Sequence, residues 1–304
     1  MPAYRALARA YPGHYRILAA PAALHPAAAL VPGAFDACAD AAALAALPSQ
    51  TRGAAIGVNL HGRGPQSHRV LLGAGARRLV AFRHPEIPES RDGADWRDDE
   101  HEVARWRRML AAAGIASDGR LDISVPDLSV PKQWLGATVL HPGAASGARR
   151  WPPERFAAVG RTLADEGAYV VVSGGAAERP LAARVVELAG LPGERNLAGR
   201  TSLLELARLI AGAGRVICGD TGVAHLATAY ATPSVLLFGP VAPALWGPPP
   251  RAEHRVLWSG ATGDPHAERI DPGLAAIGVD RVLDGVRRLP PHRAARVTCA
   301  RPIG

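Results

Sequence analysis

The sequence predicts an α/β protein made of two doubly wound domains, and three observations support this prediction. Short apolar segments alternate with amphipathic segments of helical length, which is typical of parallel sheets covered by helices. The chain has 304 residues and is 48% hydrophobic, enough for two ordinary cores. The stretch 125–134 (VPDLSVPKQW) contains two prolines and is the best linker candidate. We therefore expect domains at 1–130 and 131–304.

The first half of the chain shows the alternation weakly. A doubly wound domain normally opens with a strand that lies in the middle of its sheet. This chain instead opens inside a helical pattern, so we expect the first domain to be incomplete at its N-terminus, without a central strand and the loop after it. Helices are expected at 3–13, 65–75 and 98–114, and strands at 15–21, 54–62 and 77–82.

The second half shows the alternation clearly. The segment 168–175 (AYVVVSGG) is too apolar for a solvent-facing strand and indicates a buried parallel strand. The segment 152–167 has prolines at its start and glycine at its end, as helices often do. Strands are expected at 137–143, 168–175, 215–219, 234–240 and 254–260, and helices at 152–167, 177–190, 201–214, 223–231 and 279–289.

The net charge of +8 favours an anionic partner such as a nucleotide or a phosphorylated glycan. A coding bias explains the charge equally well, because Lys132 is the only lysine and the arginines are scattered. No basic helix alternates with aromatic residues, so we expect no nucleic-acid partner. Cys38, Cys218 and Cys299 are too few and too far apart for a disulfide framework or a zinc site. With no signal peptide and no apolar stretch long enough to span a bilayer, we expect a cytoplasmic protein.

The loops that follow the strands of the second half should meet at one edge of the sheet, where ligands bind in open α/β folds. Among them, Asp220-Thr221-Gly222 stands between a buried strand and a helix. Thr221 is placed to cap that helix, and Gly222 lets a ligand approach backbone amides that carry the positive end of the helix dipole. This arrangement suits a phosphate. Asp220 would hold loop amides or a sugar hydroxyl, and His225 could reach the anion; the alternative is an ordinary capped helix with a packed histidine.

Two other loops of the second half carry charged candidates. Arg149 and Arg150 follow a loop rich in glycine and could clamp a pyrophosphate, or they are two solvated arginines. Glu178 follows Gly174-Gly175 and could accept hydrogen bonds from ribose hydroxyls, or it is a first-turn acid favoured by the helix dipole.

In the first half, His61, Arg63, Gln66 and His68 form a polar cluster after a strand and suit a polar or phosphorylated acceptor. An ordinary loop leading into a helix explains them equally well. The acidic stretch 95–102 (DWRDDEHE) lies at a helix start, so we interpret it as a solvated face rather than a metal site. We expect neither a metal nor a cofactor.

Several strings occur together in one order: HPGA…RRWPPERF, VVVSGGAAE, NLAGRTSLLELARLI, CGDTGVAHLATAYATPSVLLFGP and WGP. Together they closely resemble glycosyltransferase family 9, the ADP-heptose heptosyltransferases of bacterial envelope glycan assembly. The resemblance is strong over roughly 138–250 and loose over the first half. It implies the GT-B architecture, in which two Rossmann-like domains face a cleft, with the donor in the C-terminal domain and the acceptor in the N-terminal one.

The resemblance also implies a reaction. A heptose-like sugar would move, with inversion and without metal, from a nucleotide diphosphate sugar such as ADP-heptose to an envelope or other glycan or glycolipid acceptor. The enzyme could be peripheral to the inner membrane face. By motif, the donor site would comprise Asp220, Thr221, Gly222 and His225 around the pyrophosphate and sugar, Arg149 at the leaving group, where the family often has lysine, and Glu178 at the nucleoside. Arg150 remains a donor-site candidate from its place in the loop alone.

One departure from the family concerns the general base. Family members begin with a strand and a glycine-aspartate loop, whose aspartate is the expected base. Either a segment with that strand precedes Met1, which we favour because losing a central strand would harm folding, or the protein binds a nucleotide sugar without efficient transfer. A nucleotide-sugar epimerase of the same architecture is a third hypothesis. Candidate replacement bases are Asp36, Asp40, His61 and His68.

Overall fold

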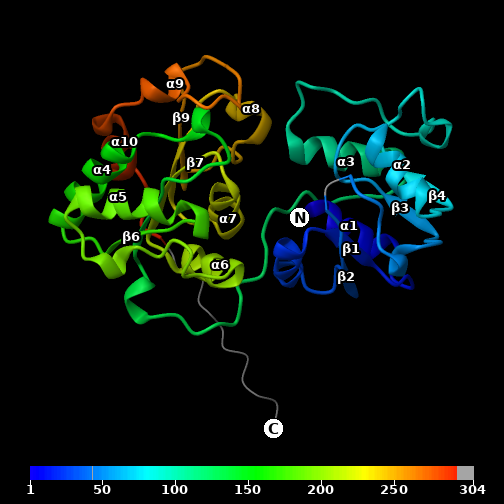
Figure 1. Cartoon of the computed structure of the whole chain (residues 1–304), viewed down its shortest axis with the longest axis horizontal. Helices are drawn as coiled ribbons and strands as arrows, with labels where there is room; N and C mark the ends of the chain where they lie inside the picture. The colour runs from blue at the N-terminus through cyan, green and yellow to red at the C-terminus, as the bar shows by residue number, and fades with distance from the viewer. Residues whose placement is uncertain (43, 293–304) are drawn as a thin grey trace, which may run out of the picture. The chain divides into compact units, whose positions relative to one another are not determined.

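A computed structural model describes residues 1–42 and 44–292 (Figure 1). The chain forms two compact units, Met1–Ser124 and a second that begins at Val125. Cys299 lies outside the described residues, whereas Cys38 and Cys218 are both free thiols. The division of roles between an acceptor-side and a donor-binding domain stays a prediction.

The second unit is built on one parallel five-stranded sheet with the order β6-β5-β7-β8-β9. In the middle of the sheet, Leu140 lies opposite Val172 on one side and Ile217 on the other. Every residue of β5, β6 and β8 is buried, which explains why the residues of these strands are mostly apolar. The strands are β5 (Thr138–His141), β6 (Val170–Val172), β7 (Arg215–Gly219), β8 (Ser234–Leu237) and β9 (His254–Leu257).

Helices cover both faces of this sheet (Figure 1). One core joins α4, α5 and α10 to Leu140 and Ile217, and the other joins α6 and α7 to Val139 and Val216. Alternate strand residues thus feed opposite cores, as in a doubly wound domain. The helices are α4 (Pro153–Asp165), α5 (Arg179–Ala189), α6 (Leu203–Gly212), α7 (Gly222–Tyr230) and α10 (Val279–Arg287), with two short ones, α8 (Pro243–Trp246) and α9 (Pro272–Ala275).

Local signals explain where two of these helices begin and end. The Ser202 hydroxyl accepts a hydrogen bond from the Glu205 amide at 3.2 Å, and the Glu205 carboxylate accepts one from the Ser202 amide at 2.7 Å. This reciprocal capping box, with Ser202 as the N-cap, starts α6 at Leu203, two residues after the predicted start at Thr201. Helix α5 ends at Gly190, whose φ of 68° lies in the left-handed region that glycine adopts freely.

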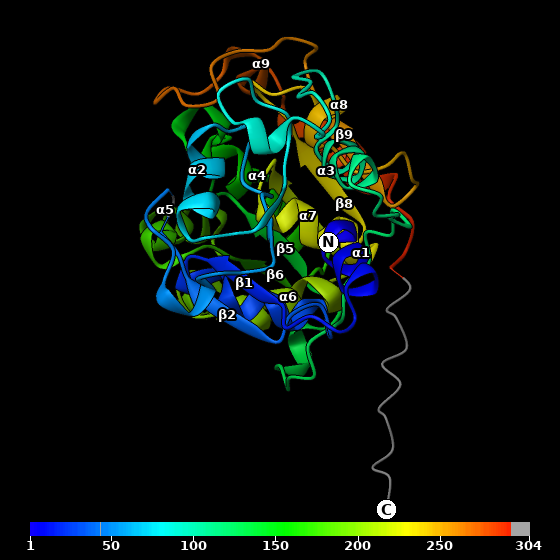
Figure 2. The ribbon, with the colours of Figure 1, turned by 90° about the vertical axis from the view of Figure 1, so that its right-hand side faces the viewer.

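The first unit has two separate parallel strand pairs, β1–β2 and β3–β4 (Figure 1), of which Figure 2 shows β1 and β2 side by side. The pair partner β2 was not predicted, because ACAD is short and alanine and aspartate are rare in strands. Part of the apolar stretch after β1 forms a 3-10 helix, Ala22–Leu30. The remaining elements are α1 (Pro2–Ala10), β1 (Ile17–Ala20), β2 (Ala37–Asp40), β3 (Ile56–Val58), α2 (Gln66–Gly73), β4 (Arg78–Val80) and α3 (Glu102–Ala112).

The acidic stretch before α3 is in part the solvated face that the pattern predicted, because Asp95, Asp98 and Asp99 are exposed. Glu100 departs from the prediction: it forms an ion pair with Arg108 at 2.6 Å, and its side chain is only 14% exposed. Glu102 pairs with Arg105 and accepts a hydrogen bond from the Trp106 indole at 2.6 Å. The interpretation failed for these two acids because the side chains that contact them lie further along α3 and reach back to its start.

Candidate functional site

Arg149 and Asp220 form the centre of the candidate site in the second unit. The strands that carry them, β5 and β7, are neighbours, so the loops after both strands lie at the same edge of the sheet. The Arg149 guanidinium lies 2.7 Å from the Asp220 carboxylate and also donates to the Asp220 backbone carbonyl. Their side chains are 26% and 8% exposed. Asp220 therefore orients Arg149, and its contact with loop amides or a sugar hydroxyl stays a prediction.

Thr221 occupies the N-cap position of α7, as predicted, but its side chain does not cap the helix. Its hydroxyl oxygen is buried and has no hydrogen-bond partner of ordinary geometry within the described part of the chain; a nearby polar group is the buried Cys218 thiol, whose pKa the hydroxyl lowers against the larger raising effect of burial. A buried hydroxyl without a partner is unfavourable and needs an explanation. Because the backbone amides at the start of α7 are also left without a side-chain cap, this helix end offers donors to an anion.

Gly222 and His225 lie on the exposed side of α7. A side chain at Gly222 would meet nothing within 4 Å, so a ligand can reach this backbone. His225 is exposed, and its ring centroid lies 6.2 Å from that of Trp246 in α8. A shallow hollow is lined by Arg149, Asp220, Leu237 at the end of β8 and the residues that follow it, and in this structure it has no room for a water-sized sphere.

Arg150 and Glu178 both contact neighbouring backbone. Arg150 is exposed and donates from Nε to the Ala144 carbonyl at 3.0 Å. The half-buried Glu178 accepts a hydrogen bond from the Gly175 amide at 2.7 Å. It also lies against Gly143, where any side chain would overlap its carboxylate. These contacts bring the loops after β5 and β6 together but do not by themselves assign either residue to a ligand.

The sequence analysis missed a buried polar pair at the ends of β5 and β6. His141 Nδ1 lies 3.0 Å from the Ser173 hydroxyl, and both residues are buried. Burial lowers the pKa of His141, while the negative charge of Glu178 acts in the opposite direction. The sequence did offer a signal for this pair, because a polar residue stands at the end of β5 and another directly follows β6, next to apolar strand residues.

A distant segment, 264–271, packs over the loop that carries Arg149. The Ala148 amide donates to the Ala267 carbonyl at 2.9 Å, and the Asp271 amide donates to the Ala148 carbonyl at 3.1 Å. A side chain at Gly147 would overlap the Glu268 carbonyl, so the two backbones touch there. This packing fixes the loop, and no local sequence pattern indicated it.

The first unit keeps three of its predicted acceptor residues accessible. His61, Arg63 and Gln66 are exposed around the start of α2. His68 is fully buried: its Nε2 lies 2.7 Å from the Phe82 carbonyl, and its Nδ1 lies 3.2 Å from the Asn59 amide nitrogen. With both ring nitrogens occupied, this arrangement favours a structural role for His68.

The two aspartates named as possible bases are engaged in local contacts. Asp36 accepts hydrogen bonds from the Arg16 backbone at 2.7 Å and from its side chain, and these bonds lower the pKa of Asp36. Asp40 accepts a hydrogen bond from the Ala22 amide at 2.9 Å. A base with a lowered pKa binds a proton less readily, so these contacts disfavour Asp36 as a general base.

Two features that are absent from the described part of the chain bear on other kinds of site. Residues 1–42 and 44–292 contain no group of three or more histidine, cysteine, aspartate or glutamate side chains arranged to hold a metal ion. None of the helices within these ranges is long and apolar enough to cross a bilayer.

A parallel sheet covered by helices on both faces defines a Rossmann-like domain, and the candidate anion site lies at the carboxyl edge of its strands. The whole chain resembles the solved E. coli ADP-heptose lipopolysaccharide heptosyltransferase II, with a TM-score of 0.67 over 94% of this chain and 92% of that one, at 24% identity. It also resembles an E. coli heptosyltransferase solved with ADP, with a TM-score of 0.65 over 94% and 93%, at 18% identity. These likenesses confirm the predicted GT-B fold.

The chain belongs to glycosyltransferase family 9 (heptosyltransferase), whose family model matches residues 90–272. This confirms the resemblance seen in the sequence. Over 122 residues the chain is 38% identical to lipopolysaccharide heptosyltransferase 2 of E. coli K12. The matched segment is 38% of this chain and 34% of that relative, so it spans about a third of the relative's length.

Proposed function

We propose that this protein is an inverting glycosyltransferase that moves a heptose-like sugar from a nucleoside diphosphate to a glycan or glycolipid of the bacterial envelope. Membership in the family and the names of the relatives support the sugar and the acceptor class. ADP-heptose is the proposed donor, because the E. coli protein of similar fold is named for it. A reducing cytoplasmic location is part of the proposal, and the free thiols Cys38 and Cys218 are compatible with it.

The observation that carries this proposal is the Arg149–Asp220 pair beside the uncapped start of α7. We assign the donor diphosphate to this point, with its oxygens toward the amides of α7, the Thr221 hydroxyl and Arg149. Gly222 leaves the approach open. Asp220 keeps the Arg149 guanidinium in place, so little reordering is required when the anion arrives.

In the proposed reaction an acceptor hydroxyl oxygen attacks the anomeric carbon from the face opposite the diphosphate. The bond between that carbon and the phosphate oxygen breaks, and its electron pair leaves with the diphosphate. Arg149 and the α7 amides stabilise the charge that develops on the leaving group, which is why we propose transfer without a metal. The hydroxyl proton passes to a base, for which the exposed His61 is a better placed candidate than the buried His68.

The donor assignment can be tested by thermal shift with ADP-, GDP- and UDP-linked sugars. We expect ADP-heptose to raise the melting temperature, and Arg149→Ala and Thr221→Val to reduce this shift. Arg184→Ala, on the exposed Arg184–Glu187 pair of α5, is the control. If no nucleotide sugar shifts the melting curve, or if the two variants respond as the control does, the donor site is wrongly assigned.

A second assay separates transfer from its alternatives. A transferase releases ADP only when an acceptor is supplied, an epimerase releases free sugar and nucleotide without one, and an inert binding protein releases neither. We expect release that depends on acceptor, with His61→Ala lowering the rate at saturating donor. Equal release with and without acceptor would favour the epimerase.

A further inference from the structure

Trp246 differs from the other tryptophans of the chain in its exposure. All six tryptophans lie within the described residues, and Trp246 is the one that belongs to the exposed large hydrophobic residues, at 39%. A single exposed hydrophobic residue is common on protein surfaces, so exposure by itself assigns no role. What needs an explanation is the place of this residue, at the end of α8 and beside the candidate donor site.

The Trp246 ring lies next to His225 of α7. The two ring centroids are 6.2 Å apart, and the ring planes are tilted by 49°. His225 comes three residues after Gly222, so both residues lie on the same face of the helix, near its uncapped start. The indole therefore borders the point to which we assign the diphosphate.

The backbone around Trp246 holds it in a fixed position. Helix α8 is a single turn that is closed by a hydrogen bond from the Gly247 amide to the Pro243 carbonyl at 2.7 Å. The loop before α8 is anchored as well, because the Gly263 amide donates to the Pro240 carbonyl at 3.0 Å. A side chain that is already held in place loses little conformational entropy when a ligand binds.

The order of the strands places Trp246 on one side of the candidate donor site. Along the carboxyl edge of the sheet, the loop of Glu178 follows β6, Arg149 follows β5, α7 follows β7 and α8 follows β8. Glu178 and Trp246 therefore lie on opposite sides of the Arg149–Asp220 pair. Since the family resemblance implies the nucleoside at Glu178, a donor whose diphosphate lies at α7 extends its sugar toward Trp246.

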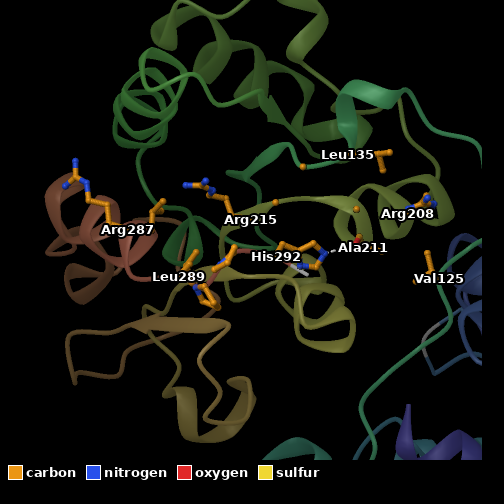
Figure 3. Close-up of a pocket in the computed structure, with 14 residues that line it drawn as sticks. Val125, Leu135, Arg208, Ala211, Arg215, Arg287, Leu289 and His292 are labelled. Atoms are coloured by element: carbon orange, nitrogen blue, oxygen red, sulfur yellow. Dashed lines mark hydrogen bonds between the residues drawn. The ribbon is translucent and has the colours of Figure 1, made fainter. Parts of the chain in front are cut away.

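A cavity at the other edge of the sheet offers no comparable convergence. It has a volume of about 770 Å³, and its walls include Arg208 and Arg215. Figure 3 shows these arginines at opposite ends of the cavity, with the Arg215 guanidinium pointing away from Arg208. The two cations do not meet at one point, so we assign no ligand to this cavity.

The chemistry of an indole suits a sugar ring. One face of a pyranose presents C–H groups and is apolar, whereas its edge carries hydroxyl groups. Tryptophan matches both parts, because its ring is apolar and its N–H donates hydrogen bonds. A charged diphosphate, by contrast, would lose water against such a surface without gaining a partner.

We propose that Trp246 is a sugar-binding residue of the donor site and that the donor sugar ring packs against the face of its indole. His225 borders the same sugar ring from α7. This inference rests on the proposed function and adds an apolar contact to the sugar, which the charged and polar residues of the site do not provide.

The experiment compares ADP-heptose with ADP, which is the same ligand without its sugar. Both are titrated by calorimetry into the full chain, into Trp246→Leu and Trp246→Phe, and into Tyr15→Leu. Leucine keeps an apolar side chain but removes the aromatic face, and phenylalanine restores one. Tyr15 is an aromatic residue of the first unit that is 73% exposed, and its leucine variant is the matched control.

The two ligands differ in charge, so each is judged by the affinity that it loses in a variant. Trp246→Leu should weaken ADP-heptose binding about fivefold to tenfold and change ADP binding less than about twofold, because an aromatic contact is worth roughly the larger factor. Trp246→Phe should recover most of the loss. Tyr15→Leu should bind both ligands as wild type does. An unchanged affinity for ADP also shows that the leucine variant is folded.

Fluorescence gives a second measurement. ADP-heptose should change the tryptophan emission of wild type more than ADP does, and this difference should be absent from Trp246→Phe. The inference is overturned if Trp246→Leu weakens ADP as much as ADP-heptose, if it weakens neither, or if Tyr15→Leu loses as much ADP-heptose binding. In these cases ADP still binds and the donor site stands. If wild type binds neither ligand, the donor site and this inference fail together.

Discussion

The Arg149 guanidinium and the Asp220 carboxylate lie 2.7 Å apart and join the loop after β5 to the loop after β7. The pair is 71 residues apart in the sequence, yet the adjacency of β5 and β7 brings the two loops together. The acid is the more buried partner, so it fixes the position of the cation beside α7. Stability and ligand binding should therefore both depend on this pair.

Arg149→Ala leaves the mostly buried Asp220 carboxylate without its cation. We expect the free energy of unfolding to fall by about 1–3 kcal/mol, because an unpaired buried charge loses its compensation. The exposed-pair variant Arg184→Ala should change it by less than about 0.5 kcal/mol. Chemical denaturation measures both, and equal effects would show that the Arg149–Asp220 pair is no stronger than a surface ion pair.

Thr221→Val replaces a buried hydroxyl that has no partner with a methyl group of similar shape. The free energy of unfolding should stay the same or rise by up to about 1 kcal/mol, because no hydrogen bond is lost. Affinity for ADP should fall by roughly tenfold if the hydroxyl contacts the donor. Thr221→Ser keeps the hydroxyl and should bind as wild type does. A valine variant with unchanged affinity would remove Thr221 from the site.

Replacement by alanine should affect stability at one glycine near the site, Gly147, and ligand binding at another, Gly222. Gly147→Ala should lower the free energy of unfolding by about 1–3 kcal/mol, because the new methyl group overlaps the Glu268 carbonyl. Gly222→Ala meets open space and should change stability by less than about 0.5 kcal/mol while weakening ADP binding. Denaturation and titration of both variants test this contrast. Stability losses of equal size would contradict it.

Stability should fall as the pH drops below about 6.5, and His68 should contribute. Burial lowers the pKa of His68 below its ordinary value of 6.5. Below that pH the unfolded chain therefore binds a proton that the folded chain does not, which favours unfolding by at most about 1.4 kcal/mol per pH unit. In denaturation between pH 5 and 8, His68→Gln should show a smaller slope. Burial also lowers the pKa of His141, His254 and His292, so part of the slope should remain.

Amide exchange should differ between the two units. Strand β7 has a hydrogen-bonded neighbour on each side, whereas β1 and β3 each have one. Although β1 reads Ile-Leu-Ala-Ala, none of its residues is fully buried. The opening free energies of β1 amides should be at least about 2 kcal/mol below those of β7 amides. Equal protection by hydrogen exchange would show that the two strand pairs of the first unit are as stable as the continuous sheet.

The sequence predicted the elements of the second unit because each of its signals is local. An apolar run such as Val170–Val172 indicates a buried strand, and a glycine such as Gly190 indicates the end of a helix. Both signals depend only on residues that are close in the sequence. The same reasoning predicts an anion site at Asp220-Thr221-Gly222, since a strand followed by glycine and a helix exposes backbone amides. It missed β2, whose alanines carry little strand preference and which forms because β1 pairs with it.

What the sequence by itself determined is the family, the order of strands and helices, and the loop that begins α7. Only the tertiary structure decided that Asp220 binds Arg149, that the Thr221 hydroxyl is left without a partner, and that His68 is buried. It also brought the Trp246 ring next to His225. The physical reason is that periodicity and capping depend on residues a few positions apart, whereas ion pairs, burial and cavities depend on which strands become neighbours.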